Sequence, residues 1–401
     1  MVHGVIVNRR PLLGRLADWI AQSGATVSVI VARSSVTSEH ELSILRSRCR
    51  ELVVVDDYDA PSVEPLILRT CASTGASVLI STTETDVIRC ARVREALGIS
   101  GQSMASALAY RDKLVMKSLA AAAGCAVVPA ACGSDAAALE ALVREGRPLV
   151  LKPRRGVASK GIARFEQPER VLEAIEPSMA DDVLVEPFVH AAMAHVDGLM
   201  LDGALYHAWP SRYLYPQWQT RHLGKPSISG QMSPDDPLLP PLLDATASVI
   251  ASLPAVAGLS AFHAEYFIGP SGVTLCEIAS RAGGAGIAES YEASFGTSLY
   301  GAPVVQQLTG GALPPCASVP PGTRHGWAWL LPRAGTLVRA PRSCALPGVV
   351  EFRSTMRAGD TFTAPHPETQ PVMEIVFDIE GPVLERLHAF DAWWHEHIEW
   401  A

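Results

Sequence analysis

Residues 261–286 read AFHAEYFIGPSGVTLCEIASRAGGAG and contain two glutamates, Glu265 and Glu277, each inside a strand-like run. The Gly-Pro-Ser-Gly segment at 269–272 separates the two runs and predicts a turn. If the runs pair across that turn, both glutamates face the same side of a hairpin. Two like charges placed so close repel each other unless a divalent cation lies between them. The stretch therefore predicts a metal site.

Further candidate site residues lie next to this predicted hairpin in the sequence. Arg281 follows the second glutamate by four positions, and Gly283 and Gly284 let the backbone approach a ligand closely. His263 alternates with Glu265, so a regular strand turns both side chains toward the same cleft. A packing or hydrogen-bonding role for His263 is the alternative. Paired acids, an arginine and glycines together indicate metal and phosphate chemistry.

Composition sets the class of protein. The chain has 401 residues, 48% hydrophobic and 18% charged, which is long and apolar enough for two to four domains. A formal net charge of −8 without a basic block argues against nucleic acid as a partner. No apolar run approaches the ~20 residues of a membrane span, and no signal-peptide pattern opens the chain. The eight cysteines show no CxxC pair and no zinc spacing, so we expect a soluble cytoplasmic protein with reduced thiols.

Residues 1–103 alternate short apolar strands with helical patterns, which predicts a parallel sheet with crossover helices. The expected elements are strands 5–7, 27–31, 52–55 and 76–80 and helices 12–22 and 87–97. No GxGxxG motif follows the first strand, which argues against a dinucleotide site. Glu84 stands at the carboxyl end of the fourth strand, where parallel sheets bind ligands, so it is a candidate substrate contact. The alternative is that Thr85 and Asp86 make this segment a helix cap only.

Residues 104–187 form a second unit around a basic loop. The expected elements are helices 106–123 and 135–144 and strands 126–128, 148–152 and 183–189. The loop PRRGVASKGI at 153–162 combines basic side chains with glycines and a serine, so its N–H groups and lysine can close over phosphates. A solvated hairpin tip is the alternative.

The remaining residues divide near 311, where Pro/Gly-rich segments mark a boundary. Before it, we expect antiparallel strands at 195–200 and 204–209, a loop at 216–237, and helices at 241–252 and 291–308. After it, we expect short strands and a final helix at 382–394.

Several short motifs occur in a specific order. They are Asp112-Lys113, Leu151-Lys152-Pro153, the loop at 153–162, Leu184-Val185-Glu186, and Glu265 with Glu277 and Arg281. This ordered set resembles the ATP-grasp superfamily and, within it, the carboxylate–amine ligases that include the bacterial L-amino-acid (dipeptide) ligases. The resemblance covers residues 1 to about 310. The tail segments 347–349 and 357–360 are also similar to the end of that ligase branch.

The resemblance implies an α/β protein with the ATP-grasp fold. Its parts would be an N-terminal parallel α/β domain (1–103), a small α+β lid domain (104–187), a larger antiparallel-sheet α+β catalytic domain (188–312) and a C-terminal extension packed on it (313–401). ATP with Mg²⁺, or Mn²⁺ in its place, would be the cofactors. The oligomeric state stays open, although dimerisation through the N-terminal domain is common in the superfamily and a homodimer is one expectation.

Roles for individual residues also follow from the resemblance. The implied nucleotide contacts are Lys113, Lys152, Ser159, Lys160, Gly161, Glu186, Pro187, Phe188, Val189 and His195. Glu265 and Glu277 would be the magnesium ligands, and Arg281 would contact the transferred phosphate or acyl phosphate. Many members have an asparagine as a further metal ligand two residues after the second glutamate. This chain has Ala279 there, so the number of metal ions stays open.

The implied activity is ATP-dependent ligation of a small-molecule carboxylate to an amine, with amino acids as substrates and an acyl phosphate as intermediate. The catalytic candidates are Arg281, Lys152 and His263. The candidate substrate contacts are Glu84, Trp209, Tyr213, His222, Arg281, Gly283 and Gly284. Two alternatives stay open. One is a bicarbonate-using carboxylase, which His195-Val196-Asp197 faintly resembles, and the other is a non-catalytic nucleotide-binding protein, which Ala279 would suit.

Overall fold

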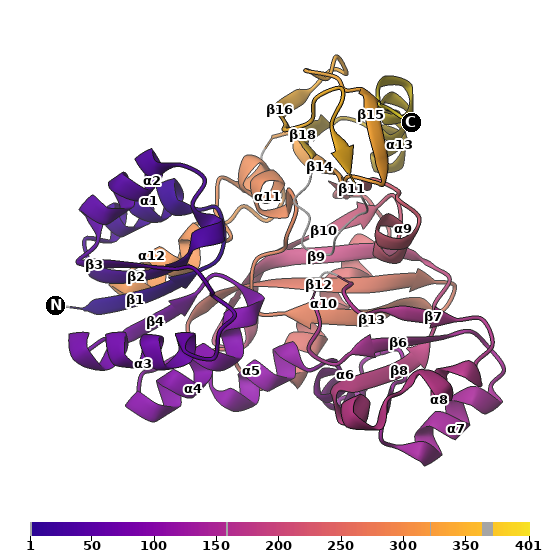
Figure 1. Ribbon diagram of the computed structural model, residues 1–401, viewed down its shortest axis with the longest axis horizontal. Helices are drawn as coiled ribbons and strands as arrows, with labels where there is room; N and C mark the ends of the chain where they lie inside the picture. Colours follow the sequence, from indigo (N-terminus) through magenta and orange to yellow (C-terminus); the bar gives the residue numbers. More distant parts are fainter. Residues whose placement is uncertain (1, 158, 321, 363–371) are drawn as a thin grey trace.

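The computed structural model describes residues 2–157, 159–320, 322–362 and 372–401. The described residues form an N-terminal parallel sheet, a four-stranded lid sheet, a large antiparallel sheet and a small sheet near the C-terminus (Figure 1). Within these residues, no helix is both long enough and apolar enough to cross a membrane.

The N-terminal sheet has the strand order β3-β2-β1-β4, and its pairings are parallel. Its strands are β1 (His3–Asn8), β2 (Thr26–Ala32), β3 (Glu51–Val55) and β4 (Val78–Ser81). Helices pack on both faces: α1 (Leu13–Ser23) and α2 (Glu39–Arg48) on one, α3 (Val63–Thr74) and α4 (Val87–Leu97) on the other (Figure 1). The predicted strands and helices of this region are confirmed, because the apolar runs are buried on both faces as a parallel sheet requires.

A helix from far along the chain completes this domain. α12 (Gly301–Thr309) packs beside α1, and its Leu308 lies in the same apolar core. Gly4 in β1 makes the close approach possible, since a Cβ there would lie 2.3 Å from Leu308 Cδ2. The single helix predicted at 291–308 is wrong. The structure has α11 (Ile287–Phe295) and then α12, because Gly296 ends α11 in a left-handed conformation.

The lid sheet has the order β5-β8-β6-β7 and is antiparallel throughout. Its strands are β5 (Ala131–Cys132), β6 (Leu149–Pro153), β7 (Ala163–Phe165) and β8 (Val183–Pro187), and its helices are α7 (Ala136–Arg144) and α8 (Arg170–Ala174). Leu139 of α7 and Val171 of α8 share a core with Leu149 and Val185 of the sheet. A strand predicted at 126–128 is wrong, because that segment forms only an isolated bridge between Val127 and Leu275.

Two helices lead into the lid where one was predicted at 106–123. They are α5 (Met104–Arg111) and α6 (Lys113–Ala122). Asp112 separates them in an extended conformation, and its carboxylate accepts from the N–H groups of Leu114 and Val115. The prediction missed this break because the apolar periodicity continues through it, although an aspartate before a helical run is a common N-cap. Three short 3₁₀ helices lie elsewhere in the described residues: η1 (Arg33–Ser35), η2 (Glu84–Asp86) and η3 (Pro177–Asp182).

The large antiparallel sheet has the order β13-β12-β9-β10-β11-β14-β18-β16. Its first five strands in space are β13 (Gly272–Ala279), β12 (Leu259–Gly269), β9 (Ala192–Leu201), β10 (Ala204–Tyr213) and β11 (Ser227–Gln231). One face packs on α10 (Leu239–Ser252) and α6, and α11 lies on the other face. The predicted loop at 216–237 is partly wrong, because it contains α9 (Gln217–His222) and β11.

The C-terminal residues extend this sheet. Its last three strands are β14 (Arg324–Leu330), β18 (Met373–Ile379) and β16 (Val349–Ser354), and β14 pairs directly with β11. The small sheet consists of β15 (Gly335–Arg339), β17 (Thr361–Phe362) and β19 (Glu399–Trp400). α13 (Val383–His397), predicted from residue 382, packs its aromatic side chains against these strands.

Candidate functional site

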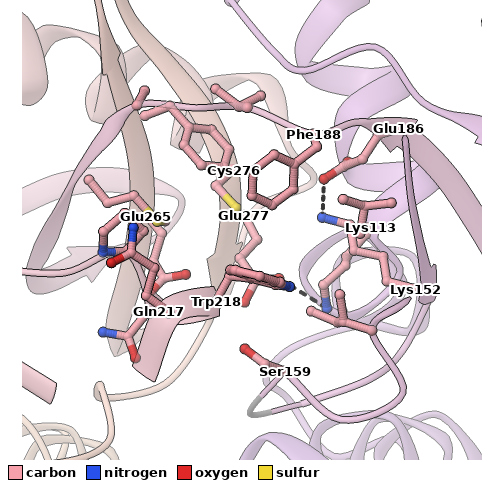
Figure 2. Close-up of a pocket in the computed structure, with 18 of the residues that line it drawn as sticks. Lys113, Lys152, Ser159, Glu186, Phe188, Gln217, Trp218, Glu265, Cys276 and Glu277 are labelled. Atoms are coloured by element: carbon pink, nitrogen blue, oxygen red, sulfur yellow. Dashed lines mark hydrogen bonds and ion pairs between the residues drawn. The ribbon is translucent and has the colours of Figure 1, made fainter. Parts of the chain in front are cut away.

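A cavity of about 480 Å³ lies between the lid sheet and the large sheet. Its walls come from β6, the loop after β6, the segment 186–193 that links the two sheets, α9, and the hairpin β12–β13. Figure 2 shows Glu265 and Glu277 on one side of this cavity and Lys152 and Ser159 across from them. The segments that carried the sequence prediction therefore meet around one space.

The predicted hairpin is confirmed. Glu265 and Glu277 are directly opposite each other in the β12–β13 pairing, and a bulge follows at Tyr266. Lys113 Nζ lies 3.0 Å from Glu277 Oε2. Burial raises the pKa of Glu277, but Lys113 and Lys152 outweigh it and hold the pKa at about 2. The Glu277 carboxylate is thus charged at neutral pH.

The partners of Glu265 come from the strands beside it. Tyr213 donates its hydroxyl to Glu265 Oε1 at 2.9 Å, and His263 Nε2 lies 3.5 Å from the same oxygen. Burial and the Glu265 carboxylate raise the pKa of Tyr213, so its hydroxyl keeps the proton that it donates. Two carboxylates side by side at the wall of a cavity form the oxygen-donor set that Mg²⁺ takes in proteins. The residues therefore fit a divalent cation.

A buried group of histidines and an aspartate lies next to Glu265. Asp197 accepts hydrogen bonds from His195 Nδ1 and from His263 Nδ1, the second at 2.8 Å. Burial lowers the pKa of His263, but Asp197 and Glu265 outweigh it and raise the pKa to about 10. His263 is therefore a cation between two carboxylates. His195, Asp197 and His263 are residue types that also bind metals, and their ligand atoms lie within 4.8 Å of one another.

The nucleotide contact expected at His195 stays a prediction. Its ring is buried, does not line the cavity, and its Nε2 lies 2.6 Å from Ser229 Oγ. Both ring nitrogens therefore already have protein partners. The resemblance placed this side chain at the nucleotide. In the structure His195 is the register partner of Glu265 and turns to the same face, but Asp197 and Ser229 are the partners of its ring nitrogens.

A lysine pair with one shared carboxylate forms the lid side of the cavity. Lys152 and Lys117 both pair with Glu186, and the Lys117 Nζ to Glu186 Oε2 distance is 2.6 Å. Burial opposes the charge on Glu186, but the two lysines outweigh it and lower its pKa. Glu186 and Lys152 line the cavity. Sequence reasoning missed Lys117, although its position one helical turn after Lys113 was a usable signal.

The basic loop after β6 closes one end of the cavity. Ser159 and Lys160 line it, and Lys113 Nζ donates to the carbonyl oxygen of Gly156 at 2.9 Å. Gly161 does not line the cavity; it has a φ of +70°, and a Cβ there would lie 2.9 Å from Pro153 Cγ. Its role is to let the loop turn back on β6. Ala158 lies outside the described residues.

The segment linking the sheets forms an aromatic wall with α9. Phe188 and Trp218 line the cavity with their rings at 77° and 5.4 Å apart, and the guanidinium of Arg164 lies 3.9 Å from the Phe188 ring centroid. Pro187 and Val189 also line the cavity. The substrate contact expected at His222 stays a prediction. His222 stacks on the outer side of α9 against Trp218, is exposed, and does not line the cavity.

A second, smaller pocket adjoins the first through shared residues. It is lined by Glu84, Tyr110, Arg111, Lys113, Met116, His263, Glu277, Ile278 and Ala279. Glu84 from the N-terminal domain accepts from Arg281 Nε at 2.9 Å and pairs with Arg111. Burial opposes the Glu84 charge, but Arg281 and Arg111 outweigh it and lower its pKa. Arg111 also donates to the carbonyl oxygen of Arg155 at 2.7 Å, which connects Arg281 to the basic loop.

Three other candidate substrate contacts have different surroundings. Trp209 is buried against α11, and its indole N–H donates to the carbonyl oxygen of Met232 at 3.1 Å. It therefore packs in this core, and the substrate contact expected of it stays a prediction. Gly283 leaves room for Asp197, whose Oδ1 would lie 2.8 Å from a Cβ there. Gly284 stands in the turn before α11, near Arg10.

Known proteins with a similar sequence and fold were compared with the chain. No family model matches it. It is 26% identical over 260 residues to the L-arginine-specific L-amino acid ligase of Bacillus subtilis, a match that covers 62% of this chain and 62% of that relative. The chain thus spans about three fifths of the length of the curated relative that it matches.

Solved structures with a similar fold align with 95% or more of this chain. An L-amino acid ligase from Bacillus licheniformis has a TM-score of 0.75 at 15% identity, covering 100% of this chain and 98% of the other. A biotin carboxylase from Campylobacter jejuni has a TM-score of 0.68 at 14% identity, covering 95% and 88%. An N5-carboxyaminoimidazole ribonucleotide synthetase from Thermotoga maritima has a TM-score of 0.67 at 18% identity, covering 100% and 99%. These likenesses confirm the predicted fold class.

Proposed function

We propose that this chain, which has the ATP-grasp fold, is an ATP-dependent carboxylate–amine ligase that releases ADP and phosphate. The observation that carries the proposal is the pairing of Glu265 with Glu277 at the wall of a cavity that also contains Lys113 and Lys152. Two acids that face two lysines across one cavity suit a metal-bound triphosphate.

The nucleotide has a defined place in this proposal. Residues 186–189 would face the adenine, while Lys113, Lys152 and the loop with Ser159 and Lys160 would hold the phosphates, since all of them line the cavity. A lysine ammonium follows a phosphate without demanding a fixed geometry. Glu265 and Glu277 would hold Mg²⁺, which neutralises charge on the phosphate oxygens when bound. One solved ATP-grasp neighbour was crystallised with MgADP.

The reaction proceeds in two displacements. An oxygen of the acid substrate attacks the γ-phosphorus of ATP, the bond to the ADP oxygen breaks, and an acyl phosphate forms. The nitrogen of the amine then attacks the carbonyl carbon, phosphate leaves with the former carbonyl-bound oxygen, and the amine loses a proton. Arg281 stabilises the acyl phosphate, and Glu84 and Arg111 hold Arg281 in place. The protein mainly aligns reactants and neutralises charge.

Amino acids are the proposed acid and amine. The support is that both the curated relative and the ligase structure of TM-score 0.75 are named L-amino acid ligases. A second support is that the cavity and the smaller pocket share Lys113 and Glu277, and that the smaller pocket is lined by Glu84, the partner of Arg281. A phosphoryl transfer to a carboxylate requires such neighbouring sites.

The test is an assay of nucleotide products. Purified chain is incubated with ATP, Mg²⁺ and pooled amino acids, and ADP and AMP are separated by chromatography. ADP release that needs both an acid and an amine supports the proposal. AMP release contradicts it, because AMP would mean an adenylate intermediate instead of an acyl phosphate.

Two further samples address the alternatives. ADP release that needs bicarbonate but no amine would indicate a carboxylase, which the structural likeness to biotin carboxylase makes worth testing. ATP binding without turnover in any substrate pool would indicate a non-catalytic nucleotide-binding protein.

A further inference from the structure

Two consecutive arginines at the end of β1 have opposite environments. Arg9 pairs with Asp59, with its Nη2 2.7 Å from Asp59 Oδ2. The guanidinium of Arg10 makes no hydrogen bond and no ion pair with any residue that the structure describes, and lies over the ring of Tyr300 at 5.7 Å. A half-buried arginine without an anion is costly to desolvate unless a ligand supplies that anion.

The backbone of Arg10 is held firmly. The buried side chain of Asn8 accepts from the Arg10 N–H at 3.1 Å and donates to the Arg10 carbonyl oxygen at 2.7 Å. Thr82 in turn donates to Asn8 Oδ1 at 2.7 Å from the neighbouring strand end. Arg10 is therefore a fixed feature of the carboxyl edge of the parallel sheet, where ligands bind in open α/β sheets.

Arg10 faces the turn that follows Arg281. A Cβ on Gly284 would lie 4.0 Å from Arg10 Nη2, and Tyr300 donates its hydroxyl to the carbonyl oxygen of Gly283 at 3.3 Å. Burial raises the pKa of Tyr300, while Arg10 and Arg281 both act to lower it. The two guanidinium groups thus lie within electrostatic reach of the same phenol.

A carboxyl group near Arg10 has one oxygen without a hydrogen-bond partner in the described residues. Oε2 of Glu289, in the first turn of α11, is buried without a hydrogen-bond partner in the described part of the chain. Burial raises the pKa of Glu289, and Arg353 and Arg10 act against it. Arg353 is already paired with Glu351 at 2.9 Å, whereas Arg10 and Glu289 do not contact each other. An arginine and a carboxyl group that lie near each other without contact would suit a ligand with charged groups of both signs.

We propose that Arg10 binds the carboxylate of the amine substrate, so that the acceptor is an amino acid or peptide and not a simple amine. Its nitrogen would then reach the acyl phosphate at Arg281 while its carboxylate lies on Arg10 beside the Gly284 turn. A guanidinium suits this role because it binds a carboxylate through two parallel hydrogen bonds. This inference rests on the proposed ligase function and assigns its acceptor subsite.

The kinetic test compares an amino acid with its amide. Each is supplied as the acceptor with ATP, Mg²⁺ and the acid found in the product assay, and ADP release is measured. The wild type is expected to prefer the amino acid. Arg10→Ala is expected to lower kcat/KM for the amino acid roughly 10- to 100-fold, to leave the amide and the KM for ATP unchanged, and so to abolish the preference. Arg9→Ala is the matched control and is expected to keep the preference.

Two outcomes separate this inference from the ligase function itself. If Arg10→Ala affects the amino acid and the amide equally, the acceptor assignment is overturned while the ligase remains. Calorimetric titration of each of the twenty amino acids into the chain with ADP and Mg²⁺ needs no turnover. Binding by the wild type that Arg10→Ala removes and Arg9→Ala retains supports the assignment. Binding by neither protein, or equal binding by the wild type and Arg10→Ala, overturns it.

Discussion

The nucleotide side and the acceptor side of the site use charge in different ways. On the nucleotide side, Glu186 pairs with two lysines and Glu277 pairs with Lys113, so the charges already have protein partners. On the proposed acceptor side, Arg10 and Glu289 lie near each other, and neither is paired with the other or with another described residue. The first side is therefore held in shape before a ligand binds, and the second leaves charges available for one. The predictions below test that contrast.

The largest effect is expected at Glu277. Glu277→Gln removes the charge opposite Glu265, and we expect turnover to fall by roughly 10³-fold or more while the fold stays intact. ADP release measures turnover, and circular dichroism checks the fold. Glu292→Gln is the control, since Glu292 pairs with Arg15 at 2.6 Å in a partly exposed ion pair away from the cavity. Turnover within tenfold of wild type would show that Glu277 is no metal ligand.

The next effect is on stability. Glu186→Gln leaves Lys117 and Lys152 buried without a carboxylate, and we expect the free energy of unfolding to fall by about 3–5 kcal/mol. Urea denaturation measures it. Glu145→Gln, which breaks an exposed pair with Arg147, should cost less than about 1 kcal/mol. Equal losses in the two variants would contradict the view that the nucleotide side is built around Glu186.

A smaller effect is expected at Glu84, which lies between the two sides. Glu84→Gln weakens the support of Arg281, and we expect kcat to fall roughly 10- to 100-fold with little change in the KM for ATP. Steady-state kinetics separate the two constants. Glu64→Gln in the same domain, which breaks the 2.9 Å pair with Arg92, should change neither. A rise in the KM for ATP without a loss of kcat would place Glu84 on the nucleotide side instead.

How much the sequence could predict depends on how far apart in the chain the contacting residues are. The hairpin with Glu265 and Glu277 was predictable because the pairing is local, across a four-residue turn. The parallel N-terminal sheet was predictable from alternating elements. The contact between Glu84 and Arg281 joins residues 197 apart, and no local pattern encodes it.

Predictions made from short stretches of sequence also have limits with physical causes. His195 and Trp209 are polar or aromatic residues near the motifs, but the packing of the large sheet, which a single sequence does not reveal, decides that both are buried and that neither lines the cavity. Lys117 was missed because its carboxylate partner, Glu186, lies 69 residues away. No sequence motif pointed to Arg10.

The smallest effect is expected for substitution of His222. This variant tests where the nucleotide side ends on α9. His222 stacks on Trp218 with ring centroids 4.9 Å apart but does not line the cavity. His222→Ala should therefore change the KM for ATP less than twofold and stability by no more than about 0.5 kcal/mol. Trp218→Ala, which removes a ring that does line the cavity, should raise the KM for ATP roughly tenfold. If both variants raise the KM equally, α9 acts as a unit over the nucleotide, and the cavity boundary drawn at Trp218 is wrong.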